Sequence, residues 1–164
     1  MPEKHLVINT GPIIALIAAT KSLDILDKLY DKVVVTNEVK SEVCFQGQKS
    51  FGSKEFLEAG FITHIEKPLV LSPMLKNSLD KDEASVIQYA LDNGIVNVCI
   101  DEAMGRRIAR LNELKVTGSL GILIKGKQKG LNISIKESVV KMHNNGIFLS
   151  QNLINKALEI SGEK

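Results

Sequence analysis

Short apolar runs alternate along the chain with longer segments whose apolar residues recur at helical spacing. The short runs are typical of β-strands, and the continuous β-branched run Val33-Val34-Val35 is expected in a strand that is covered on both faces. This pattern predicts strands at residues 5–8, 33–35, 61–65, 96–100 and 115–117.

Helices are predicted between and after these strands. Pro12 suits the first turn of a helix, and the nearly all-apolar segment 13–19 predicts a helix that is buried on most sides. Asp80 is expected to cap a helix over 81–92, which Asn93-Gly94 ends. Further helices are expected at 23–29 and near 56–57. One that carries Glu38 and Glu42 is expected after a Thr36 or Asn37 cap, and one that carries Ile108, Leu111 and Leu114 after Asp101. The last ones are expected from 118–119 to 127 and as a pair within 133–164 joined at Asn145-Gly146, with Ser150 capping the second.

Strands that alternate with helices predict a mostly parallel sheet with helices on both faces. Right-handed crossovers then bring the carboxyl ends of the strands to one edge, where open α/β sheets hold their sites. With 164 residues and 44% apolar content, the chain is expected to form one domain over 1–164, with the helical pair 133–164 packing on the same core.

Composition narrows the class of protein. The net charge of +2 and 24% charged residues argue against a disordered chain and against a strongly basic protein that surrounds nucleic acid. The apolar runs are too short to cross a bilayer, and no signal peptide is recognised, so a cytoplasmic protein without a membrane partner is expected. Two cysteines do not suggest a metal knuckle or a disulfide scaffold, and Cys99 is expected to be a buried free thiol.

Four polar residues are candidates for chemistry. Asn9 ends the first predicted strand and Asp101 a later one, while Glu42 and Glu83 lie on helices that can pack beside the same edge. Three carboxylates and one carboxamide form an all-oxygen ligand set, which suits Mg²⁺ or Mn²⁺. Three buried anions repel one another, so a cation is expected among them.

Each of these residues also has a purely structural explanation. Asp80-x-x-Glu83 fits a capping box, and Asp101 is a suitable cap for the helix that follows it. Glu42 fits a solvated helix face, and Asn9 before Thr10-Gly11-Pro12 fits a turn. The shared position at one sheet edge is what favours the functional interpretation.

Basic and aromatic residues supply candidate contacts to a nucleic acid. All three arginines, Arg106, Arg107 and Arg110, lie on the helix after Asp101, where guanidinium groups suit phosphate oxygens; a solvated helix face is the alternative. Lys125, Lys127 and Lys129 are candidates to extend this positive rim. Phe45 and Phe51, in the polar loop 44–54, are candidates to stack an unpaired base or, alternatively, to anchor the loop.

Several motifs together resemble a known family. The motif Val7-Ile8-Asn9-Thr10-Gly11-Pro12-Ile13-Ile14-Ala15-Leu16 resembles the opening of PIN domains, and more closely that of the uncharacterised branch DUF3368. No single motif is specific, but their order and spacing extend the resemblance over nearly the whole chain. The other similar segments are 36–43, 80–90, 100–107, 116–121 and 145–150.

The resemblance implies a three-layer α/β/α PIN-like fold with a sheet of four to five strands and a metal-dependent ribonuclease site. Asn9 stands where the family usually has its first aspartate, and Glu42, Glu83 and Asp101 match its other acidic positions. Thr10 and Ser119 match hydroxyl positions that line such sites, and Glu102 is placed to substitute or assist. A carboxamide at position 9 can coordinate Mg²⁺ or Mn²⁺, but it brings no negative charge.

The hypothesis from the sequence is therefore a Mg²⁺- or Mn²⁺-dependent endoribonuclease that hydrolyses RNA phosphodiester bonds, with a role as the toxin of a toxin–antitoxin pair and an antitoxin protein as partner. Asn9 favours an alternative, a catalytically weak or inactive PIN-like module that binds RNA or a protein. A receiver-like phosphoacceptor domain is disfavoured because Asn9-Thr10 does not supply paired acids. The apolar stripe of the last helix is expected on the protein's own core, with a homodimer contact as the alternative.

Overall fold

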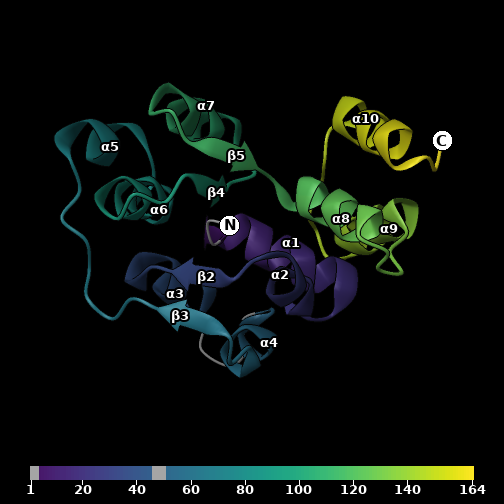
Figure 1. The fold of residues 1–164 in the computed structure, drawn as a ribbon, viewed down its shortest axis with the longest axis horizontal. Helices are drawn as coiled ribbons and strands as arrows, with labels where there is room; N and C mark the ends of the chain where they lie inside the picture. Colours follow the sequence, from purple (N-terminus) through teal and green to yellow (C-terminus); the bar gives the residue numbers. More distant parts are fainter. Residues whose placement is uncertain (1–3, 46–50) are drawn as a thin grey trace.

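A computed structural model describes residues 4–45 and 51–164, and within them one parallel sheet of five strands (Figure 1). All four strand pairings are parallel, and the spatial order is β3-β2-β1-β4-β5. The strands are β1 (His5–Ile8), β2 (Lys32–Val35), β3 (Ile62–His64), β4 (Asn97–Cys99) and β5 (Lys115–Thr117). This arrangement confirms the predicted α/β class and gives the upper strand number of the expected range.

Ten helices flank the sheet in the described part of the chain. They are α1 (Thr10–Thr20), α2 (Asp24–Leu29), α3 (Asn37–Val43), α4 (Ser53–Glu58), α5 (Pro73–Ser78), α6 (Lys81–Asp92), α7 (Ala103–Leu111), α8 (Ser119–Gln128), α9 (Ile135–Asn144) and α10 (Gln151–Ser161). None is long and apolar enough to span a membrane.

The helices form the two outer layers of a three-layer α/β/α fold. On one side α6 packs on β1 and β4 and contacts α5 and α7. On the other side α2 packs on β2, and α1 contacts α8 and α9. Figure 1 shows α8, α9 and α10 grouped beside α1 and α2, with α5 and α6 on the opposite side. The apolar pattern of α1 explains its central place, because its residues from Pro12 to Ala19, apart from Ile14, are buried.

The centre of the sheet positions the site. β1 lies between β2 and β4, with Leu6 paired to both Val33 and Asn97. The strand order therefore reverses at β1, and the crevice at the carboxyl ends of β1 and β4 is the place where open α/β sheets bind ligands. Asn9 directly follows β1, and its backbone N–H donates to the Cys99 carbonyl at 3.0 Å, which joins the two strand ends.

The main difference from the predicted elements is α5. No helix is predicted between residues 65 and 81, but Pro73 starts one, and the Ser72 hydroxyl caps it by accepting from the Leu75 N–H. Leu114, predicted to lie on the helix after Asp101, lies outside α7, because α7 ends at Leu111 and Glu113 adopts a positive φ of 63°. Ser150 caps α10 as predicted, and Cys99 is a buried free thiol.

One carboxylate connects the segment after α10 to helices α8 and α9. Glu163 accepts hydrogen bonds from Lys127 Nζ at 2.7 Å, from the Ile135 N–H at 2.6 Å, and from the Lys136 N–H and the Ser134 hydroxyl. Partial burial works to raise the pKa of Glu163, but these donors outweigh it and hold the pKa at about 2. The carboxylate therefore caps α9 and links it to α8.

We expect Glu163→Gln to lower the free energy of unfolding by about 1–2 kcal/mol at pH 7, discounted for the partial exposure of the pair. The wild-type contribution is present above the unfolded pKa of about 4.5 and is lost as the pH falls toward 2, because the folded carboxylate has the lower pKa. Urea unfolding of both proteins at pH 7 and pH 3 measures this. Glu159→Gln, at an exposed position of α10, is the matched control, and an equal loss in both variants would contradict the role of Glu163.

Candidate metal centre

Three carboxylates meet beside the start of α6. Oxygen atoms of Asp80, Glu83 and Glu102 lie within 4.8 Å of one another, and no other such group of three acidic, histidine or cysteine side chains occurs in residues 4–45 and 51–164. Asp80 is the N-cap residue of α6, Glu83 lies in its first turn, and Glu102 precedes α7. The packing of α6 against α7 thus brings together residues that are far apart in the sequence.

Glu83 is the buried member of this acidic cluster, while Asp80 and Glu102 are exposed. Burial raises the pKa of Glu83 to about 7, with further contributions from the negative charges of Glu102, Asp82 and Asp80. Gly105 on α7 makes room for the carboxyl group, because a Cβ there would lie 2.5 Å from Glu83 Oε2. Close carboxylates with a raised pKa are expected where a cation normally balances them.

The capping-box explanation for Asp80 and Glu83 does not hold. Asp80 occupies the N-cap position of α6, but its side chain makes no capping hydrogen bond. The sequence predicts only a capping role for Asp80, whereas in the structure Asp80 is a member of the acidic cluster. The sequence feature that indicates a shared site is the one-turn spacing of Asp80 and Glu83, because this spacing also places both side chains on one face of the helix.

Asp101 lies at the same sheet edge and has a structural contact of its own. Its Oδ1 accepts the backbone N–H of Ser119 at 2.7 Å, so it stabilises the first turn of α8 rather than capping α7. Burial raises the pKa of Asp101, and the hydrogen bond from the Ser119 N–H and the Arg106 charge oppose this. Arg106 Nη1 donates to the Ile100 carbonyl at 2.8 Å, which fixes the guanidinium next to this carboxylate.

Several buried oxygen atoms at this edge have no hydrogen-bond partner. Among the seven such side-chain atoms in the described residues are Asn9 Oδ1, Thr10 Oγ1, Glu83 Oε2 and Ser119 Oγ. All four belong to residues that the sequence analysis had placed in the site. Buried polar atoms are normally hydrogen-bonded, so unpaired oxygens gathered at one sheet edge indicate a ligand that carries positive charge or donates hydrogen bonds.

A comparison with protein-family models now adds an independent observation. The model of DUF3368, described as a PIN domain, matches residues 5–163. The chain belongs to this PIN-domain family. A search of curated proteins finds no match. PIN domains are generally nucleases that use divalent metals, and the all-oxygen donors of this PIN domain fit a hard divalent cation.

Glu42 does not join the acidic cluster. It is exposed on α3 and lines a hollow of about 280 Å³ together with Glu38, Asp80 and Asp82. The expected grouping of Glu42, Glu83 and Asp101 is therefore replaced by Asp80, Glu83 and Glu102. Glu38, one helical turn before Glu42, is the buried acid of α3: its Oε2 accepts the Leu69 N–H at 2.8 Å, and its Oε1 has no partner.

The basic residues divide between the two ends of the sheet. Arg106, Arg107 and Arg110 follow Asp101 on α7, and Arg107 and Arg110 are exposed. Lys125 lies near the far end of α8 beside Lys4 and Asn97, at the beginnings of β1 and β4. Lys127 pairs with Glu163 at 2.7 Å. Lys125 and Lys127 therefore do not extend the positive rim of the acidic edge, because α8 runs away from that edge.

Proposed function

We propose that the protein is a metal-dependent endoribonuclease of PIN-domain type, which hydrolyses phosphodiester bonds of RNA at the edge formed by the ends of β1 and β4. The observation that carries the proposal is the cluster Asp80, Glu83 and Glu102 around a buried carboxylate whose pKa is raised to about 7. Membership in a family of nucleases supports the reaction class.

Asp80, Glu83 and Glu102 would hold Mg²⁺ or Mn²⁺, with Asp101 and the neutral oxygen of Asn9 at the same edge as further candidate ligands. Three observations support this fit: all the donor atoms are oxygens, the three carboxylates repel one another without a cation, and the oxygens of Asn9 and Glu83 are unpaired. When bound, such a cation supplies activation of water and neutralisation of phosphate charge.

The chain's own residues would orient the RNA. Arg106 is held by the Ile100 carbonyl, and its position beside Asp101 suits a phosphate oxygen next to the acidic edge. A groove of about 270 Å³ continues from Asp101 and Arg106 between α8 and α10, where it is lined by Ser119, Lys156 and the apolar side chain of Leu153. Lys156 is thus a further basic candidate for contacts to the RNA, one that the sequence pattern does not indicate.

Other candidate RNA contacts lie outside this groove. Arg107 and Arg110 are exposed along α7 and suit contacts to the RNA backbone. Phe45 and Phe51 expose 80% and 49% of their surface, which supports base stacking over anchoring in the core. The part of their loop at 46–50 lies outside the described residues.

A second candidate function is a PIN-like module that binds RNA or a protein without cleaving it. Asn9 favours this function, because it lowers the negative charge of the site by one relative to an aspartate. The engagement of Asp101 Oδ1 by Ser119 also favours it, since one oxygen of this carboxylate already has a structural partner. A toxin role, with an antitoxin as partner, is the biological part of our main proposal, and growth arrest on expression of the protein is its test.

The reaction is tested with Asp101→Asn, which keeps the oxygen that accepts the Ser119 N–H and removes the charge. With Mn²⁺ and a pool of single-stranded and structured RNAs, we expect cleavage to fall by about 100-fold or more. We also expect millimolar Mn²⁺ to raise the melting temperature of the wild type by several degrees, because a ligand of the folded state stabilises it. The shift should be smaller in the variant.

Glu58→Gln, at an exposed position of α4, is the matched control and should cleave as the wild type does. Equal cleavage by wild type and Asp101→Asn would exclude Asp101 from the proposed site. RNA binding with a Mn²⁺ shift but without cleavage by the wild type would favour the second candidate function.

A further inference from the structure

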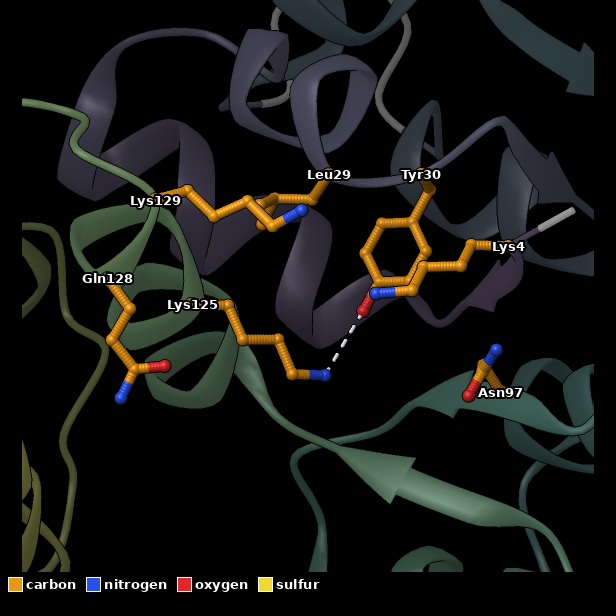
Figure 2. Close-up of a pocket in the computed structure, with 7 residues that line it drawn as sticks. All are labelled: Lys4, Leu29, Tyr30, Asn97, Lys125, Gln128 and Lys129. Carbon is orange, nitrogen blue, oxygen red and sulfur yellow. Dashed lines mark hydrogen bonds between the residues drawn. The ribbon is translucent and has the colours of Figure 1, made fainter. Parts of the chain in front are cut away.

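We propose that a hollow at the beginnings of β1 and β4 binds a small phosphate-bearing anion, either an inorganic phosphate or a nucleotide. The hollow has a volume of about 340 Å³ and lies between β1, β4 and the ends of α2 and α8 (Figure 2). This volume lies within the range of small-molecule sites in proteins. It lies at the amino-terminal edge of the parallel sheet, opposite the acidic edge, so the proposal is independent of the proposed nuclease function.

Three lysines from separate parts of the chain line the hollow. Lys4 precedes β1, Lys125 lies on the last turns of α8, and Lys129 directly follows α8. Figure 2 shows the ends of the Lys125 and Lys129 side chains extending toward the space near Tyr30. Lys125 Nζ donates to Tyr30 Oη at 3.3 Å and lies 5.9 Å from the centre of its ring, so this ammonium group has a defined position.

The positive charge of the hollow is not balanced by its own lining. Among residues 4–45 and 51–164, no acidic side chain lines it and none of its three lysines forms an ion pair. Asp31 is a nearby acid, and its carboxylate accepts the backbone N–H of Lys4 at 2.6 Å without lining the hollow. Burial lowers the pKa of Lys125, and the charge of Lys4 acts in the same direction. A bound anion would relieve the repulsion between these lysines.

The neutral groups favour a phosphate over a simple halide. Burial, as the larger cause, raises the pKa of Tyr30 to about 12, so its hydroxyl keeps its proton. Because Tyr30 Oη accepts from Lys125, the Tyr30 O–H is available to donate to a phosphate oxygen. Asn97 donates its Nδ2 to the His5 carbonyl at 3.2 Å, which leaves its Oδ1 as an acceptor for a ligand hydroxyl. Donors for phosphate and an acceptor for a sugar hydroxyl thus line one hollow.

The test uses isothermal titration of the full chain in EDTA, which removes divalent ions from the acidic edge, with phosphate, pyrophosphate and adenosine monophosphate as separate probes. We expect at least one probe to bind, with affinity lowered about tenfold or more by Lys125→Ala and several-fold by Tyr30→Phe. Tighter binding of pyrophosphate or phosphate would identify an inorganic ligand, and tighter binding of adenosine monophosphate a nucleotide. Lys76→Ala, at an exposed position of α5, removes the same charge elsewhere and should bind as the wild type does.

The proposal would be overturned if none of the probes bound at millimolar concentration, or if Lys76→Ala weakened binding as much as Lys125→Ala. It would also be overturned if only an RNA oligonucleotide bound in a Lys125-dependent manner, since that would make the lysines a backbone contact for a macromolecule. Circular dichroism of each variant shows whether a loss of binding comes from unfolding. Lys125→Arg, which keeps the charge, should retain more affinity than Lys125→Ala.

Discussion

Glu83→Gln should lower RNA cleavage by at least about 100-fold while making the metal-free protein more stable at pH 8. Glutamine has the shape of the protonated carboxyl group, but it cannot supply the negative charge that a cation requires. The wild-type carboxylate is buried beside Glu102 and Asp82, so its ionisation opposes folding when no cation is present. We expect the variant to gain on the order of 1 kcal/mol in free energy of unfolding.

The pH dependence of this gain follows from the raised pKa of Glu83. In the unfolded chain the group ionises near 4.5, and in the folded protein near 7. Between these values the folded state binds more protons, so the stability of the metal-free wild type falls as the pH rises. The advantage of Glu83→Gln should therefore be absent near pH 4.5 and complete above pH 7. Urea unfolding in EDTA at pH 5 and pH 8 measures it.

Glu58→Gln again serves as the control, and it should change neither cleavage nor stability. A Glu83→Gln protein that cleaves RNA normally would remove Glu83 from the site. A variant that is less stable than the wild type at pH 8 would show that the carboxylate has a favourable partner in the folded protein.

The second large effect is expected for Gly105→Ala. A Cβ at this position would lie 2.5 Å from Glu83 Oε2 and 2.9 Å from Ile100 Cγ2. The Glu83 side chain can turn away, but Ile100 is fully buried, so the substitution both displaces the carboxylate and overpacks the core. Overpacking lowers the free energy of unfolding by about 1–3 kcal/mol, and the higher helix propensity of alanine offsets up to about 1 kcal/mol of this loss. We expect a net loss of about 1–2 kcal/mol and weaker Mn²⁺ stabilisation.

Gly11→Ala is the control for this substitution, because Gly11 also lies in a helix and a Cβ there would meet no atom within 4 Å beyond its chain neighbours. Pro12 disfavours a helical alanine before it, so we expect a loss of stability that is smaller than that of Gly105→Ala and no loss of Mn²⁺ stabilisation. Urea unfolding and Mn²⁺-dependent melting compare the two variants. Unchanged Mn²⁺ stabilisation in Gly105→Ala would show that the Glu83 carboxyl position does not determine metal binding.

The acidic site was only partly predictable. Asn9 and Asp101 could be placed from sequence, because each follows an apolar run and parallel strands end at one edge. The pairing of Asp80 with Glu102 could not, since it depends on how α6 packs against α7. The choice between Glu38 and Glu42 as the buried acid of α3 likewise depends on tertiary contacts, because both residues lie on nearly the same helix face one turn apart, and only Glu38 is covered and accepts the Leu69 N–H.

The order of apolar and polar residues alone determined the alternation of strands and helices, and with it a parallel α/β sheet, because the two periodicities of side-chain direction are local properties of the backbone. It also determined the buried helix α1 and the polar residues that end β1 and β4. Tertiary structure decided which carboxylates meet, and it carried Lys125 to the edge opposite Asp101. These outcomes depend on the angles and lengths of packed helices, and such geometry arises only when distant segments contact one another.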